Sequence, residues 1–154
     1  MNSSVVLDLL IESGLTISFA ESMTGGYASY QLIKSPGASS AIKLSLITYS
    51  NESKEQMLGI TKEELKKHSV VSTEIALLMA KAVKTLANSD IGVGVTGNAG
   101  PTVQEDTEDS VACIGIVYNE VEYSYKFQFF NLSRVEAIRK CVDFIYDRLE
   151  EILT

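Results

Sequence analysis

The chain has 154 residues, 45% of them hydrophobic and 21% charged, with only two prolines, and this composition excludes a disordered chain. A chain of this length normally builds one hydrophobic core, so we predict a single domain over residues 1–154. The formal net charge of −7 argues against a nucleic-acid partner, because such proteins present basic surfaces. A small anionic ligand stays possible, since local N–H groups and one or two cations can hold a phosphate.

The N-terminal residues MNSSVVLDLLIESG lack a basic segment, and Asp8 interrupts their apolar stretch, so we do not expect a signal peptide. No segment approaches the roughly 20 apolar residues of a membrane-spanning helix. We therefore expect a cytoplasmic protein without a membrane partner. Cys113 and Cys141 lie in apolar runs and are expected to be reduced core thiols.

Apolar spacing, caps and turn residues predict an alternation of helices and strands. Helices are expected over residues 5–11, 26–33, 52–58, 61–67, 73–87 and 134–153. Strands are expected over residues 16–20, 41–49, 90–96, 111–118 and 121–130, with the second strand buried and the last two forming an antiparallel hairpin at residues 119–120. The acidic stretch 104–109 is predicted to be a solvated loop.

This order of elements predicts an α/β fold, a three-layer α/β/α sandwich with a mixed, mostly parallel central sheet and one antiparallel hairpin. Ligands in such sheets bind beyond the carboxyl ends of the strands. Those ends are predicted to be residues 22–26, 49–54 and 96–101, so three loops should meet at one edge of the sheet.

Ser22 follows a predicted strand and precedes a helix, with two glycines close behind it. This position presents a hydroxyl next to backbone N–H groups that could hold an oxyanion or a phosphate. The alternative is that Ser22 only caps the helix. The second loop of interest, residues 96–100, has glycines that permit a ligand to approach the backbone.

Lys54 is the candidate base for a Ser22 nucleophile. If Asn51 caps the helix, Lys54 is its third residue, where the helix dipole and burial would both lower the pKa of the amine. Tyr49 could hydrogen-bond the same pair and relay the proton. The alternatives are a solvated Lys54 and a core Tyr49. His68, the only histidine, follows a lysine-rich stretch and is expected to be exposed, and no metal site or cofactor is implied.

Six sequence segments, in the same order as in the family, closely resemble the CinA C-terminal domain family over nearly the whole chain. They are AESMTGG at residues 20–26, PGAS at 36–39, YSNESK at 49–54, LG at 58–59, VSTEIA at 71–76 and VTGNAGP at 95–101.

Stand-alone members of this family are similar to nicotinamide-nucleotide amidase, which converts nicotinamide mononucleotide to the nicotinate nucleotide and ammonia. The resemblance implies a hydrolase of a linear amide in NAD recycling, with Ser22, Tyr49 and Lys54 as catalytic residues and a homodimer as the assembly. Longer relatives carry an N-terminal molybdopterin-binding-like domain, for which 154 residues leave no room. The residues that we expect to contact a nucleotide substrate are Glu21, Thr24, Gly25, Gly26, Thr96, Gly97, Asn98 and Gly100.

The chain departs from the family pattern in the loop at residues 101–112, which is acidic where the family is glycine-rich, and at Asn98, where a larger apolar residue is common. The residues before Tyr49 also differ. These departures affect substrate recognition more than the catalytic residues. Two other functions therefore stay open: a nucleotide-binding module without turnover, and a partner-binding protein of competence or DNA-damage responses.

Overall fold

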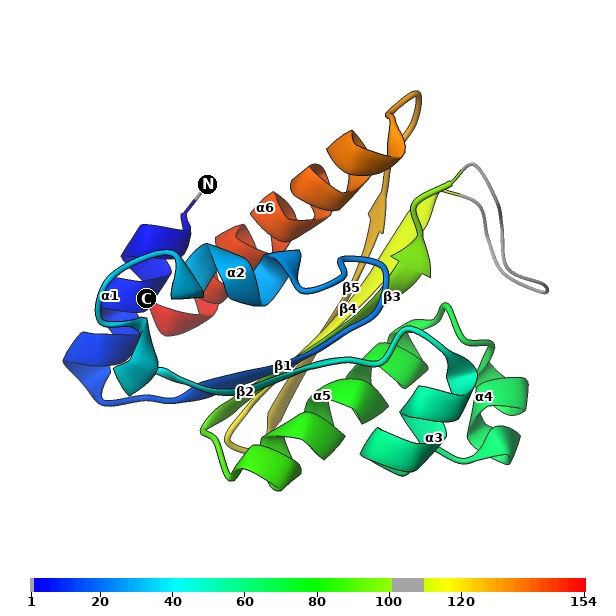
Figure 1. Ribbon diagram of the computed structural model, residues 1–154, viewed down its shortest axis with the longest axis horizontal. Coiled ribbons are helices and arrows are strands. Elements are labelled where there is room, and N and C mark those ends of the chain that lie inside the picture. The colour runs from blue at the N-terminus through cyan, green and yellow to red at the C-terminus, as the bar shows by residue number, and fades with distance from the viewer. Residues whose placement is uncertain (1, 101–109) are drawn as a thin grey trace.

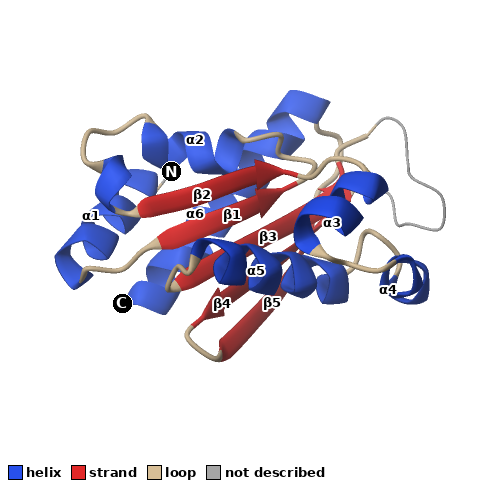
Figure 2. Cartoon of the chain, turned by 60° about the horizontal axis from the view of Figure 1, so that its bottom comes forward, coloured by secondary structure: helices blue, strands red, loops and turns tan. Residues whose placement is uncertain are grey.

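The computed structural model describes residues 2–100 and 110–154, which form a five-stranded sheet with helices on both faces (Figure 1 and Figure 2). In chain order the elements are α1 (Ser3–Ser13), β1 (Ile17–Glu21), α2 (Tyr27–Ile33), the 3-10 helix η1 (Ala38–Ser40), β2 (Ile42–Ile47), α3 (Asn51–Leu58), α4 (Lys62–His68), α5 (Thr73–Ala87), β3 (Ile91–Asn98), β4 (Val111–Tyr118), β5 (Val121–Gln128) and α6 (Arg134–Leu153). The predicted acidic loop at residues 104–109 lies outside the described residues.

The strand order in the sheet is β2-β1-β3-β4-β5. Strand β1 pairs in parallel with β2 and β3, whereas β4 is antiparallel to both β3 and β5. The predicted α/β fold with a mixed sheet and a terminal antiparallel hairpin is therefore confirmed. Because β2, β1 and β3 run in the same direction, their carboxyl ends lie at one edge of the sheet.

Two cores lie on opposite faces of the sheet. Helices α1, α2 and α6 cover one face, where Phe19, Val95 and Tyr146 are fully buried. Helix α5 packs on the other face with α3 and α4 beside it, and Ile75 and Met79 are buried there. Cys113 and Cys141 are buried thiols, and neither forms a disulfide within the described residues. No helix in residues 2–100 and 110–154 is long and apolar enough to cross a membrane.

Helix α5 packs closely on the sheet where glycines face it. A Cβ atom built on Gly94 would lie 2.2 Å from the carbonyl oxygen of Ala76, and one on Gly92 would lie 2.1 Å from that of Ala80. The glycines of β3 therefore allow the backbones of β3 and α5 to approach closely. The buried stripe of α5 accordingly includes the small residues Ala76 and Ala80, whereas Leu86 is exposed.

Two sequence predictions near the site differ from the structure. Residues 41–49 were expected to form a buried strand, but β2 is a shorter edge strand with half-exposed side chains, because only β1 pairs with it. Helix α3 is capped by Ser50, not Asn51: the Ser50 side chain accepts a hydrogen bond from the Ser53 N–H, and the Ser53 hydroxyl accepts one from the Ser50 N–H. Lys54 is therefore the fourth residue of α3.

Candidate active site

Ser22 and Lys54 meet at the carboxyl edge of the sheet. Ser22 directly follows β1, and Lys54 reaches it from the first turn of α3. The Lys54 Nζ atom lies 3.2 Å from Ser22 Oγ and donates a 2.7 Å hydrogen bond to the carbonyl oxygen of Thr48. The Lys54 side chain is only 1% exposed. The structure thus places the predicted nucleophile and base within direct hydrogen-bond distance, without an intervening group.

Burial lowers the pKa of Lys54 from 10.5 to about 8, because the charged ammonium loses its hydration. At neutral pH roughly a tenth of the amine is then uncharged, compared with about one part in 3,000 for an ordinary lysine. The direction of the pKa shift agrees with the sequence prediction, and of the two predicted causes burial is the one that lowers the pKa. A neutral amine can donate to the Thr48 carbonyl and still use its lone pair to accept the Ser22 proton.

A cavity of about 620 Å³ opens beside this pair. Its walls are residues 22–23 after β1, residues 49–52 from the end of the β2–α3 loop into the first turn of α3, residues 97–99 at the end of β3, and Arg134 at the start of α6. The three strand-end loops that were predicted to meet do so here. The cavity size suits a small molecule of nucleotide dimensions.

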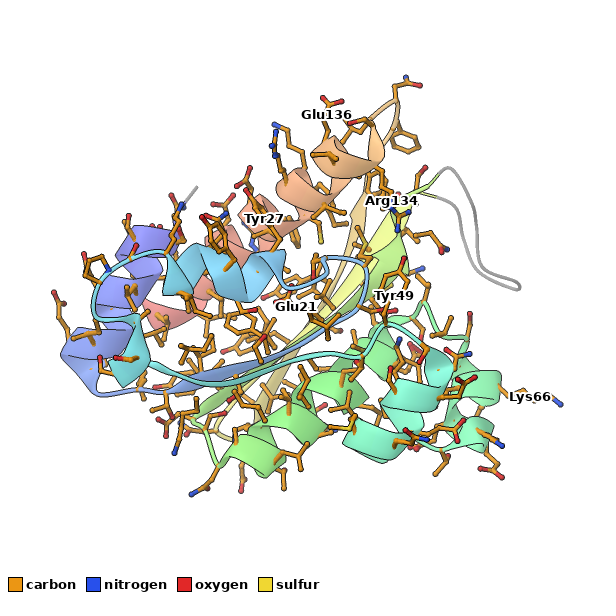
Figure 3. All side chains as sticks on the ribbon, in the orientation of Figure 1. Glu21, Tyr27, Tyr49, Lys66, Arg134 and Glu136 are labelled. Atoms are coloured by element: carbon orange, nitrogen blue, oxygen red, sulfur yellow. The ribbon has the colours of Figure 1, made fainter. Side chains whose placement is uncertain are left out.

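Tyr49 lines the cavity but takes no part in the Ser22–Lys54 hydrogen bond. Its side chain is 59% exposed, and its hydroxyl accepts a 2.8 Å hydrogen bond from Arg134 Nη2. Figure 3 shows Tyr49 and Arg134 at the same end of the sheet. Within the described residues no hydrogen bond joins Tyr49 to Ser22 or Lys54, so the expected proton relay through Tyr49 is not seen. The alternative of a core Tyr49 is wrong as well.

Arg134 is the functional candidate that sequence reasoning missed. Its guanidinium also donates a 2.7 Å hydrogen bond to the carbonyl oxygen of Gly100, so it joins α6 to the ends of β2 and β3. One sequence signal was available: an arginine at the first position of a helix, directly after the Ser133 cap, opposes the helix dipole. Such a local conflict often marks a residue with another task.

Glu21, which is labelled in Figure 3, is fully buried, and its carboxylate anchors the turn after Ser22. It accepts hydrogen bonds from the N–H groups of Gly26, Ala28 and Ser29, and from the hydroxyls of Thr24 and Ser29. Glu21, Thr24, Gly25 and Gly26 were predicted to contact substrate, but none of them lines the cavity. The Gly26 N–H, expected to hold an oxyanion, is bound to Glu21, and the Gly25 N–H donates to the Ser22 carbonyl.

The predicted residues of the third loop fall into two groups. Gly97 and Asn98 line the cavity, and Gly100 borders it through its bond to Arg134. Thr96 is fully buried, and its hydroxyl donates to the carbonyl oxygen of Val70, so it fastens β3 to the segment before α5. His68 lies outside the cavity walls and is half-buried beside Glu74. The altered loop at residues 101–112 lies largely outside the described residues.

The model of one protein family, the CinA C-terminal domain, matches residues 2–153. A protein named "Putative competence-damage inducible protein" from Lysinibacillus sphaericus is 35% identical over 153 residues, which is 97% of this chain and 36% of that protein. A protein of the same name from Bacillus subtilis is 42% identical over 131 residues, which is 83% of this chain and 32% of that protein. The chain thus spans about a third of the length of these curated relatives.

Solved structures share the whole fold. A CinA superfamily protein from Klebsiella pneumoniae superposes with a TM-score of 0.94 at 27% identity, covering 98% of this chain and 94% of that one. A competence/damage inducible protein from Agrobacterium tumefaciens gives a TM-score of 0.93 at 25% identity, covering 99% and 93% of the two chains. The family resemblance inferred from the sequence motifs is therefore confirmed.

Proposed function

The chain belongs to the CinA C-terminal domain family, and on this premise we propose that it is an amidohydrolase that releases ammonia from the carboxamide of nicotinamide mononucleotide or a related small amide. One observation carries the proposal: a buried lysine amine with a lowered pKa lies 3.2 Å from a serine hydroxyl at the wall of a cavity. This is the arrangement that activates a serine nucleophile when histidine is absent.

In the proposed reaction, Ser22 Oγ forms a bond to the amide carbon while its proton passes to the neutral Lys54 amine. The carbonyl π electrons move to the oxygen and create an oxyanion. When the oxyanion collapses, the carbon–nitrogen bond breaks, and Lys54 returns the proton so that ammonia leaves. Water then attacks the Ser22 ester, with Lys54 again accepting and returning a proton, and releases the carboxylic acid.

The charges around the cavity support a substrate that carries a phosphate. Arg134 places a guanidinium at the cavity wall, and guanidinium groups bind phosphate through paired hydrogen bonds. The Gly97–Ala99 segment lines the same cavity. Because the site chemistry needs only a carboxamide beside Ser22, a related small amide fits the proposal equally well.

The test is ammonia release from nicotinamide mononucleotide by the purified protein, compared with Ser22→Ala. Ser124→Ala is the matched control, because Ser124 is an exposed residue of β5 on the far edge of the sheet from β2. We expect Ser22→Ala to lose turnover by several orders of magnitude and Ser124→Ala to keep it. Wild-type protein that releases no more ammonia than Ser22→Ala would contradict the proposal, and retained nucleotide binding would then indicate a binding module.

A further inference from the structure

Most backbone N–H groups of residues 22–29 donate to acceptors within the protein. The Ser22 N–H donates to Val95, the Gly25 N–H to Ser22, and the Tyr27 N–H to Thr24. The N–H groups of Gly26, Ala28 and Ser29 all donate to the Glu21 carboxylate. The start of α2 therefore has no donor left for a ligand at these positions, although the sequence suggested one.

Two N–H groups of this segment, those of Met23 and Thr24, have no acceptor within the part of the chain that the structure describes. Of these two residues only Met23 lines the cavity beside Ser22, and it is 4% exposed. A buried N–H group without a partner is rare and costs free energy, so its presence at a cavity wall indicates an acceptor that arrives with a ligand.

The turn geometry explains why the Met23 N–H is left over. The bond from the Gly25 N–H to the Ser22 carbonyl closes a β-turn over residues 22–25, in which Met23 is the second residue. The N–H group at that position makes no bond within a β-turn, which is why proline is common there. It also belongs to the residue after the nucleophile, so only a few covalent bonds separate it from Ser22 Oγ.

We propose that the Met23 N–H is an oxyanion-hole donor, which binds the carbonyl oxygen of the substrate when Ser22 attacks the amide carbon. This inference rests on the proposed function. Negative charge develops on that oxygen in the tetrahedral intermediate, and a fixed donor stabilises it more strongly than it stabilises the neutral substrate. The catalytic unit then consists of Ser22, Lys54 and one backbone group that no side-chain comparison would identify.

The kinetic test uses Met23→Pro, which removes this N–H together with the thioether side chain, with Met23→Leu as the matched control, which also replaces the thioether but keeps the N–H. The second residue of a β-turn accommodates proline, so the turn is expected to persist. We expect kcat of Met23→Pro to be about 10²- to 10³-fold below that of Met23→Leu, with similar KM and similar melting temperatures. Equal kcat values for the two folded variants would overturn the proposal.

A second measurement on the wild-type protein does not depend on the proline variant. Pyridine-3-boronic acid copies the aromatic carboxamide, and its boron can accept Ser22 Oγ to form a tetrahedral anion while Lys54 takes the proton. In ¹⁵N-labelled protein the Met23 amide proton should move downfield when this adduct forms, while those of Gly25 and Gly26 stay in place. An adduct that leaves the Met23 proton unmoved overturns the oxyanion hole alone. Failure to form any adduct, together with no ammonia release, contradicts the proposed function itself.

Discussion

Lys54 can act as a base only after it has lost its proton, so its lowered pKa sets the pH dependence of the proposed reaction. Since burial lowers the pKa to about 8, the neutral fraction rises through that pH and then saturates. We expect kcat/KM for the carboxamide to rise about tenfold per pH unit below pH 8 and to level off above it. A steady-state profile from about pH 6 to about pH 9.5 checks this. A flat or falling profile over that range is incompatible with Lys54 as the base.

The same burial has a cost in stability. The unfolded chain holds the Lys54 proton up to its ordinary pKa of 10.5, whereas the folded chain releases it near pH 8. Between these values the unfolded state binds more protons, so the contribution of Lys54 to stability rises with pH. From pH 7 to pH 9.5 we expect wild type to gain about 2 kcal/mol of unfolding free energy relative to Lys54→Met.

Urea unfolding at the two pH values measures this difference, because the other titrating groups cancel between wild type and variant. Lys67→Met is the control, since Lys67 is an exposed residue of α4. Relative to this variant, wild type should gain almost no unfolding free energy between the two pH values. If the unfolding free energies of wild type and Lys54→Met differ by the same amount at both pH values, then the Lys54 ammonium is not destabilised in the folded protein.

Sequence reasoning identified Ser22 and Lys54 for a physical reason: each follows the end of a strand, and parallel strands bring those ends together. It could not place Tyr49 correctly, because the direction of a side chain at a strand end depends on packing that no local pattern encodes. Arg134 was missed because its partners, Tyr49 and Gly100, lie 85 and 34 residues away in the chain. The structure replaces the expected relay with a direct Ser22–Lys54 contact.

At the scale of the elements, α5, α6 and β4 were predicted with the observed bounds because their local signals are strong, whereas β5 ends at Gln128, two residues before the predicted end. Helices α5 and α6 begin directly after the side-chain caps Ser72 and Ser133, and the Asn119–Glu120 turn sets the β4–β5 hairpin. The predicted burial of β2 was wrong because an apolar run in the sequence looks the same for a central strand and for an edge strand. The cap of α3 was one residue off because Ser50 and Asn51 are both good capping residues.

The packing of α5 on β3 predicts a large effect of a small change. In Gly94→Ala the new methyl group would lie 2.2 Å from the Ala76 carbonyl oxygen, a backbone atom that cannot rotate away. Helix α5 must then shift from the sheet, and we expect a loss of about 1–3 kcal/mol or more in the free energy of unfolding. Ser124→Ala, at an exposed position of β5, should change it by less than about 0.5 kcal/mol. Chemical denaturation of the two variants makes the comparison, and equal stabilities would show that the α5–sheet spacing is not fixed by the glycine.

For the whole molecule, overall charge and local charge act in opposite directions. The net charge of −7 repels an anionic ligand at long range, while Arg134 attracts it at the cavity wall. Long-range repulsion is screened over about 10 Å at ordinary salt, so we expect the local guanidinium to dominate the binding of a phosphate group in the proposed substrate. The same balance does not favour a long polyphosphate such as DNA, which would contact much of the acidic surface.

This balance predicts which ligands stabilise the fold. In Ser22→Ala, which cannot turn over, nicotinamide mononucleotide at about 100 times its Kd should add about 2.7 kcal/mol to the free energy of unfolding. For a domain of this size that corresponds to a rise of roughly 5–10 °C in Tm. Nicotinamide riboside, which lacks the phosphate, should give a smaller rise at the same concentration.

The double variant Ser22→Ala/Arg134→Gln should respond alike to both ligands, because the group that distinguishes them is gone. Arg139→Gln, a change to an exposed residue of the same helix, is the matched control and should preserve the difference. If the riboside protects Ser22→Ala as well as the nucleotide does, Arg134 does not bind the phosphate, and the substrate is an amide without an anionic group at that position.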